Sequence, residues 1–284
     1  MKAIIPAAGK GTRLLPNTLG APKELITFLG KPSIEWAIDY LKENNINDIT
    51  IITGYKKSAL FDYLGTGSFF NVKIDYALQH NPKGLGHAIL CAKNNILEDD
   101  FIVYLGDTII VPKNNPFGKS HDLEELVKLH LEKNAFATML LEEVLNPEIY
   151  GVVRFDKKSK LITDIYEKPK DEKVKKRFRL KNGKYLAISG IYVFNKEIFD
   201  YLKKLKPGLN NEIQLTDAIL NALKDENIVY GRILNGMRVD IGNFNYLKHE
   251  QEIYGMLKNE QLEAWINERE SLGKKIKREV YNEK

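Results

Sequence analysis

Residues 2–13, which read KAIIPAAGKGTR, decide the fold class because they join an apolar run to a glycine-rich turn. The run from Lys2 to Ala7 predicts a buried strand, since parallel strands covered on both faces form continuous apolar segments. Gly9 and Gly11 follow at once, and glycine lets the backbone turn sharply and approach a ligand closely. A strand that opens into such a loop is typical of α/β folds, which bind ligands at the C-terminal edge of the sheet.

The segments that follow alternate between strand-like and helix-like patterns. Strand-like runs occur at residues 49–53, 72–78, 101–105 and 135–141. Helical spacing occurs at residues 33–44, 56–64, 85–96 and 121–133. This order predicts a Rossmann-like, three-layer α/β/α fold around a mostly parallel central sheet.

The pattern changes in the middle of the chain. Residues 150–156 and 161–166 flank a polar turn and predict a hairpin, and residues 185–195 predict a third strand. We therefore expect a smaller, mixed β lobe here. A helix at 213–223 and strands at 229–234 and 237–241 come next, and residues 243–284 favour helix almost throughout.

Composition narrows the classes of function. Hydrophobic residues make up 43% of the 284 residues and charged residues 29%, which is typical of a soluble globular protein and excludes disorder and collagen-like repeats. No apolar run approaches the roughly 20 residues that span a bilayer, so we expect no membrane partner. A net charge of +5 from mixed charges argues against nucleic acid and leaves acidic small molecules as partners. The single cysteine, Cys91, excludes a disulfide framework and predicts a reducing, cytoplasmic location.

The glycine-rich loop is the first candidate for chemistry. A dinucleotide-binding GxGxxG would need a small residue at position 14, which is Leu14, and the P-loop pattern is absent. Arg13 and Lys23 lie in the same stretch and favour phosphate binding by backbone N–H groups and side-chain cations. The alternative is that Gly9 and Gly11 form only a tight turn.

A second loop, residues 79–88, also follows a strand and opens a helix. The amide of Gln79 can donate and accept, which suits the edge of a nucleobase, and Gly84 allows close contact. His87 taken alone is more often a core or capping residue than a catalyst. The five histidines show no metal-ligand spacing.

Two acidic residues come at the ends of apolar runs. Asp107 follows residues 101–105, and Asp240 lies in residues 237–241. Strand ends of a parallel-type sheet can open on one edge, and carboxylates there can hold Mg²⁺ against phosphate oxygens. The alternative for each is a turn or a helix cap. The basic stretch 168–184 is interpreted mostly as a solvated loop.

Taken in order, these stretches resemble the sugar-1-phosphate nucleotidylyltransferases, most closely the bacterial-type UTP–glucose-1-phosphate uridylyltransferases. The segments that carry the resemblance are GKGTRLLP (9–16), PKEL (22–25), KP (31–32), GLGHA (84–88), YGV (150–152), EKP (167–169), NNEIQLTD (210–217) and VDIG (239–242). The resemblance implies a catalytic domain at residues 1–242, with a nucleotide-binding part at about 1–145 and a sugar-binding part at about 146–242. Residues 243–284 would then be a C-terminal helical extension.

The resemblance also implies roles for individual residues. The implied catalytic residues are Arg13, Lys23 and Asp107, and the implied Mg²⁺ ligands are Asp107 and Asp240. The implied nucleotide-binding residues are Ala7, Ala8, Gly9, Gly11, Thr12, Gln79 and Gly84. The implied sugar-phosphate-binding residues are Gly151, Glu167, Lys168 and Gly190.

The implied reaction joins UTP, or dTTP, to glucose 1-phosphate and releases pyrophosphate, and we expect a homo-oligomer. Glu212 and Asp217 are left out of the site, as packing residues. Two other readings stay open: a sensor that binds sugar nucleotides without turnover, and a Rossmann dehydrogenase, which Leu14 disfavours. Trp265 could pack within the chain or across a subunit interface.

Overall fold

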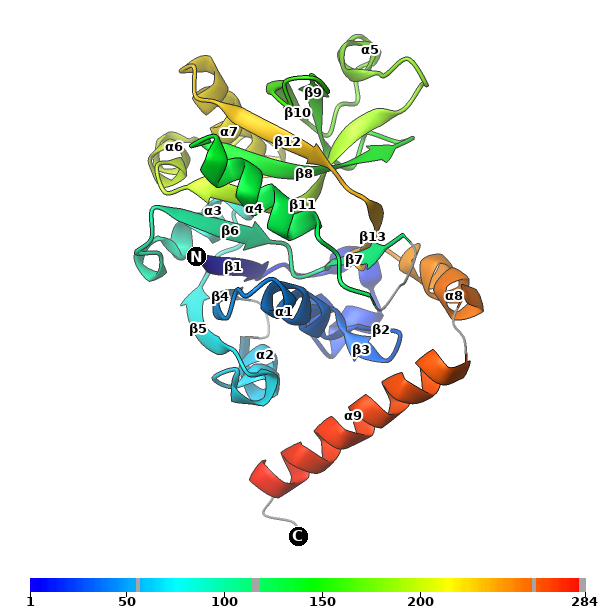
Figure 1. The fold of residues 1–284 in the computed structure, drawn as a ribbon. Coiled ribbons are helices and arrows are strands. Elements are labelled where there is room, and N and C mark those ends of the chain that lie inside the picture. Colours follow the sequence, from blue (N-terminus) through cyan, green and yellow to red (C-terminus); the bar gives the residue numbers. More distant parts are fainter. Residues whose placement is uncertain (55–56, 114–117, 257–258, 281–284) are drawn as a thin grey trace.

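The computed structural model describes residues 1–54, 57–113, 118–256 and 259–280, which form one large sheet, two small sheets and the helices around them (Figure 1). The strands of the large sheet are β1 (Lys2–Ala7), β4 (Asp48–Thr53), β5 (Lys73–Leu78), β6 (Asp100–Tyr104), β8 (Ala137–Val144), β9 (Gly151–Phe155), β10 (Ile162–Glu167), β11 (Tyr185–Asn195) and β12 (Val229–Ile233). The small antiparallel sheets pair β2 (Thr27–Phe28) with β3 (Lys31–Pro32), and β7 (Thr108–Pro112) with β13 (Gly236–Asp240).

The large sheet is mostly parallel, as predicted. β1 lies parallel to both β4 and β6, and β5 extends the parallel part beside β4. β11 runs antiparallel to both β6 and β8, so those two strands point the same way. The predicted hairpin is formed by β9 and β10. β9 also pairs with β11, so the hairpin extends the large sheet as its mixed part, at the top of Figure 1.

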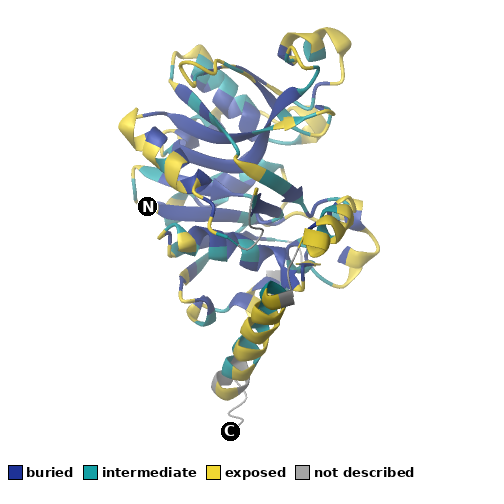
Figure 2. Ribbon diagram, turned by 45° about the vertical axis from the view of Figure 1, so that its right-hand side comes forward, coloured by how far each residue is buried: buried dark blue, intermediate teal, exposed yellow. Residues whose placement is uncertain are grey.

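Helices cover both faces of this sheet. They are α1 (Ser33–Glu43), α2 (Lys57–Leu64), α3 (Leu85–Cys91), α4 (Asp122–Glu132), α5 (Glu172–Phe178), α6 (Ile198–Lys204), α7 (Leu215–Lys224), α8 (Tyr246–Met256) and α9 (Asn259–Val280). Successive side chains of a strand point to opposite faces, so Ile4 packs with residues of α3, α6 and α7, and Ile5 with residues of α1, α2 and α4. The buried sheet between two partly exposed helical layers confirms the three-layer prediction (Figure 2).

Several elements differ from the expectations. The helix expected at 85–96 ends at Cys91 and gives way to a short 3₁₀ turn. The basic stretch 168–184 is mostly loop, as predicted, but it also contains the short helix α5, which was not predicted. The Asp171 side chain caps α5 by accepting hydrogen bonds from the N–H groups of Lys173 and Val174, and Phe178 is buried against the lobe. Helix α6 was not predicted.

A further difference concerns the strand around Asp240. The strand is present, but it pairs with β7 in a separate ribbon rather than with the large sheet. One face of this β7–β13 ribbon carries Ile109, Val111 and Val239, which pack with α8 residues Tyr246 and Ile253. Since direction alternates along a strand, Arg238 and Asp240 lie on the other face, with Thr108 paired opposite Asp240.

The C-terminal helix α9 lies beside the main body and contacts it through its aromatic residue (Figure 1). The Trp265 ring stacks on Trp36 of α1 with centroids 5.5 Å apart, and its Nε1 donates to the Leu29 carbonyl at 3.0 Å. Arg269 forms an ion pair with Glu35. Trp265 therefore packs within the chain. None of the described helices is long and apolar enough to cross a membrane.

Candidate active site

Two adjoining cavities lie along the C-terminal edge of the parallel strands. The loop cavity, of about 550 Å³, is bounded by the loop after β1, the turn after β5 and the start of α3. The lobe cavity, of about 600 Å³, is bounded by β9, β10, β11 and β13. They share wall residues, among them Arg13, Leu85, Asp107 and Glu212, so they form two halves of one cleft.

The cleft collects nearly all the residues that the sequence singled out. The loop cavity is lined by Ala8, Gly9, Gly11, Thr12, Arg13, Lys23, Gln79, Gly84 and Asp107. The lobe cavity is lined by Arg13, Asp107, Gly151, Glu167, Lys168, Gly190 and Asp240. Ala7 is the exception, because its side chain is 1% exposed in the core and lines neither cavity.

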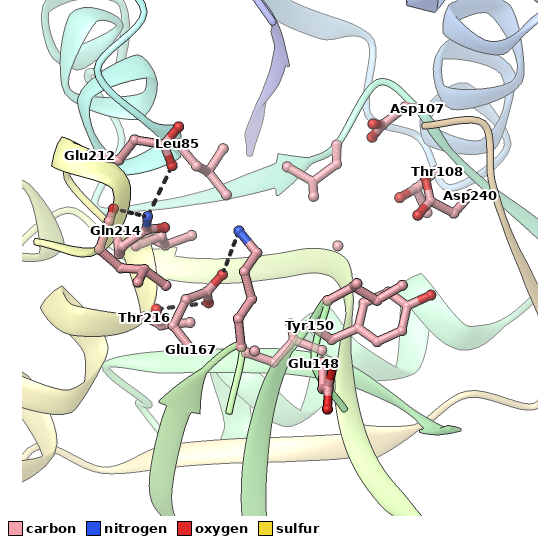
Figure 3. Close-up of a pocket in the computed structure, with 18 of the residues that line it drawn as sticks. Leu85, Asp107, Thr108, Glu148, Tyr150, Glu167, Glu212, Gln214, Thr216 and Asp240 are labelled. Atoms are coloured by element: carbon pink, nitrogen blue, oxygen red, sulfur yellow. Dashed lines mark hydrogen bonds and ion pairs between the residues drawn. The ribbon is translucent and has the colours of Figure 1, made fainter. Parts of the chain in front are cut away.

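Asp107 and Asp240 converge where the cavities meet. A Cβ placed on Gly242 would lie 2.8 Å from Asp240 Oδ1, 3.2 Å from Asp107 Oδ2 and 3.0 Å from Arg13 Nη2. A side chain at position 242 would enter the space between these three groups and displace at least one of them. The Ile241 N–H donates to the Asp107 carbonyl at 2.9 Å and ties the end of β13 to the turn after β6. Figure 3 shows Asp107, Thr108 and Asp240 together at one end of the lobe cavity.

A buried ion pair lies beside this point. The Lys23 ammonium contacts the Asp107 carboxylate and lies 3.6 Å from Glu24 Oε1. Burial opposes both charges, but the pairing outweighs it: the pKa of Lys23 lies above its usual value, and the pKa of Asp107 lies below its usual value. Burial raises the pKa of Glu24 to about 7, against the opposing effect of Lys23. The site thus holds a fixed cation and a fixed anion in contact.

The residues around Gln79 are drawn together by glycines. A Cβ on Gly54 would lie 2.7 Å from the Gln79 carbonyl oxygen and 3.1 Å from Ala8 Cβ, so Gly54 lets the ends of β1 and β5 approach. Gly84 has φ = +93°, and it lies against another segment of the protein: a Cβ at this position would be 2.8 Å from Glu212 Cβ. The Ile213 N–H donates to the Lys83 carbonyl at 2.8 Å. The backbone at Gly84 therefore packs closely against segment 212–213 of the chain, a contact that was not predicted from the sequence.

The opposite end of the cleft is built around Glu167. Gly151 pairs with Glu167 across the β9–β10 hairpin, and a Cβ on Gly151 would lie 3.1 Å from Glu167 Oε2. Thr216 Oγ1 donates to Glu167 Oε2 at 3.0 Å, and Lys168 Nζ lies 3.2 Å from Glu167 Oε1 (Figure 3). Lys168 adopts φ = +47°, a costly conformation for lysine, and such strain concentrates at functional sites. Gly190, at φ = +90°, forms the facing wall against Thr108.

Several residues that line the cleft were not predicted from the sequence. Arg238 lines the lobe cavity, donates from Nε to Glu142 and lies 4.7 Å from the centroid of the Tyr150 ring. Its charge also lowers the pKa of Asp107. The period-two pattern of β13 could have revealed Arg238, because it puts residues 238 and 240 on one face. Glu212, which was predicted to be a packing residue outside the site, lines both cavities.

Comparison with known proteins agrees with this geometry. Residues 2–255 match the family model described as nucleotidyl transferase. The UTP–glucose-1-phosphate uridylyltransferase YngB of Bacillus subtilis is 34% identical over 266 residues, which cover 85% of both chains. The low-salt glycan biosynthesis nucleotidyltransferase Agl11 of Haloferax volcanii is 34% identical over 243 residues, which cover 85% of this chain and 62% of that protein.

The fold is shared with a solved structure as well. The crystal structure of UDP-glucose pyrophosphorylase complexed with UDP-glucose has a TM-score of 0.77 and 31% identity, over 90% of this chain and 99% of that one. The family model spans the motifs from the first glycine-rich loop to Asp240. The chain therefore belongs to the nucleotidyl transferase family, and its predicted resemblance to the sugar-1-phosphate nucleotidylyltransferases is confirmed.

Proposed function

We propose that this protein transfers a uridylyl group from UTP to glucose 1-phosphate, making UDP-glucose and pyrophosphate. The observation that carries the proposal is the convergence of Arg13, Lys23, Asp107 and Asp240 where the two cavities meet. One cavity is lined by the glycine-rich loop with Arg13 and Lys23, and the other by Glu167, Lys168 and Arg238. If the nucleotide binds in one cavity and the sugar phosphate in the other, their phosphates meet at this junction, where the charged side chains can neutralise them.

The transfer needs no general base. An oxygen of the sugar phosphate, already ionised at neutral pH, attacks the α-phosphorus of UTP as the bond to the β-phosphate breaks and pyrophosphate leaves. Catalysis then consists of alignment and neutralisation of negative charge. Lys23, held charged by Asp107 and Glu24, lies where it can neutralise the reacting phosphate. Arg13 lines both cavities and is suited to the departing phosphates.

The donor set at the junction fits Mg²⁺. Asp107 and Asp240 offer hard carboxylate oxygens, and Mg²⁺ is usually held by one or two carboxylates plus substrate phosphates. The described residues contain no group of three or more His, Cys, Asp or Glu side chains that could hold a metal, so substrate phosphates would have to complete the site. When bound by these two aspartates, Mg²⁺ supplies positive charge to the phosphate oxygens.

The sugar phosphate would occupy the lobe cavity. Glu167, with two oxygens held by Thr216 and Lys168, is suited to sugar hydroxyls, and the backbone at Gly151 and Gly190 leaves room for the ring. Lys168 is the candidate contact for the phosphate of the sugar. The choice of glucose rests on the similarity to the Bacillus and UDP-glucose proteins.

A matrix of nucleoside triphosphates against sugar 1-phosphates, with pyrophosphate release as the readout, tests the proposal. We expect UTP with glucose 1-phosphate to be the best pair. We also expect measurable turnover of dTTP, because one methyl group changes selectivity by only about 1–3 kcal/mol. A preference for GTP would contradict the choice of base. Binding of UDP-glucose without pyrophosphate release from any pair would instead identify a sensor.

A further inference from the structure

The orientation of the Gln79 amide is determined by its two neighbours. Gln79 is 4% exposed, and its amide nitrogen Nε2 lies 3.1 Å from the Gly84 carbonyl oxygen. A carbonyl oxygen only accepts hydrogen bonds, so the amide atom that faces it must be the donor nitrogen. The amide oxygen Oε1 therefore points elsewhere.

The second neighbour is His87, in the first turn of α3. The same Nε2 lies 2.9 Å from His87 Nδ1, so Nδ1 must accept the second amide hydrogen. The imidazole is then neutral and carries its proton on Nε2. Burial, and then the charge of Lys83, lower the pKa of His87, which favours the same neutral form. The other contact of Nδ1 is Cys91 Sγ, at 3.9 Å.

With both amide hydrogens used, Gln79 can offer only an acceptor to the loop cavity. Oε1 accepts no hydrogen bond from the described part of the chain, and Gln79 lines the cavity. A base that places a ring N–H at this point gains a hydrogen bond, as uracil does with N3–H. Cytosine in the same pose presents an acceptor at N3, so its lone pair and that of Gln79 Oε1 repel each other and no hydrogen bond forms.

We propose that His87 is a positioning residue for base selection: it accepts a hydrogen bond from Gln79 and so presents the amide oxygen that selects uracil over cytosine. This inference rests on the proposed function. His87 acts through Gln79, so its loss should affect which base binds more than how fast the bound substrate reacts.

The kinetic experiment compares wild-type enzyme with His87→Leu and His87→Gln, measuring kcat/KM for UTP and for CTP with glucose 1-phosphate. Leucine removes the acceptor, and we expect the preference for UTP to fall about tenfold through a higher KM for UTP, with little change in kcat. Glutamine can accept through its own oxygen and should restore the preference. Cys91→Ala, on the same helix and also beside His87, is the matched control and should leave the ratio unchanged.

The outcomes separate this inference from the proposed function. Equal losses for UTP and CTP in His87→Leu would show a merely structural role and overturn the inference alone. A wild-type enzyme without any preference for UTP would overturn the choice of uracil together with this role. The nitrogen-15 NMR spectrum of the wild-type imidazole gives a test without substrate: we expect the proton on Nε2, and a neutral ring protonated at Nδ1 would overturn the inference directly.

Discussion

Asp107 and Asp240 face each other across Gly242, although they are far apart in the chain. Asp107 comes from the turn after β6, and Asp240 from the end of β13 in the β7–β13 ribbon. The space that a Cβ on Gly242 would take is within 3.2 Å of one oxygen from each carboxylate. Two carboxylates this close repel each other unless a cation lies between or beside them. In this structure Lys23 pairs with one of them, Asp107.

We expect Asp107→Asn and Asp240→Asn each to abolish most turnover while the protein stays folded. If both residues hold one Mg²⁺, the double variant should be hardly slower than either single variant, because each change breaks the same site. Steady-state rates of the three variants and the wild type measure this. Rate losses that multiply in the double variant would show that the two aspartates do not share a metal.

Removal of the metal gives an independent measurement. Activity should vanish with a chelator and return with Mg²⁺ or Mn²⁺. Because a ligand that binds only the folded state stabilises it, Mg²⁺ and UTP together should raise the Tm more than the sum of their separate effects. Activity that persists in excess chelator would contradict the proposed metal site.

We expect Lys23→Ala to lower kcat by roughly a hundredfold to ten-thousandfold, the usual scale for one electrostatic group at a phosphate. Lys128→Ala is the matched control, since Lys128 is exposed on α4 and forms a surface ion pair with Glu132. The fold should survive in both variants, which circular dichroism can verify. Wild-type rates in Lys23→Ala would refute the proposed mechanism.

Arg13→Ala should differ from Lys23→Ala in its kinetics. Arg13 lines both cavities and is suited to the β- and γ-phosphates, so its loss should raise the KM for UTP and lower kcat together. Parallel titrations of UTP and glucose 1-phosphate will separate the two variants. An unchanged KM for UTP would place Arg13 away from the nucleotide phosphates.

We expect Thr216→Val to raise the KM for glucose 1-phosphate about tenfold and to leave the KM for UTP nearly unchanged. Valine removes the hydroxyl that donates to Glu167 Oε2 while it keeps the shape of the side chain. Thr216→Ser keeps the hydroxyl and should behave like wild type. A larger effect on UTP than on the sugar phosphate would mean that the lobe cavity does not bind the sugar.

Gly84→Ala tests the packing of the second loop. We expect it to lower the free energy of unfolding by more than Gly183→Ala does. Both glycines have a positive φ, which costs alanine about 1–2 kcal/mol, but a Cβ at residue 84 would also meet Glu212 and Ile213, whereas residue 183 has open space. Urea denaturation measures the difference. Equal losses would show that strain alone requires glycine at residue 84.

Local sequence patterns predict the layers and most of the cleft. Continuous apolar runs predict buried parallel strands, and spacing of three to four residues predicts the helices that cover them, because both patterns report burial along a local segment. Side chains in the loops that follow such strands, such as Arg13, Gln79 and Asp107, lie at one edge of the sheet, where the carboxyl ends of parallel strands meet. That is why so many predicted site residues line the cleft.

Local patterns could not show which distant segments pair. Long-range contacts place Asp240 in a ribbon with β7, bring Arg238 to the same cleft face, and pack segment 212–213 on Gly84. Helix α5 was not predicted because its lysines obscure the helical spacing of Val174 and Phe178. These two side chains pack against β9 and β11, and that contact is not visible in the local sequence. The physical reason is the same in each case: these positions are stabilised by contacts between residues remote in sequence, and neither propensity nor periodicity records such contacts.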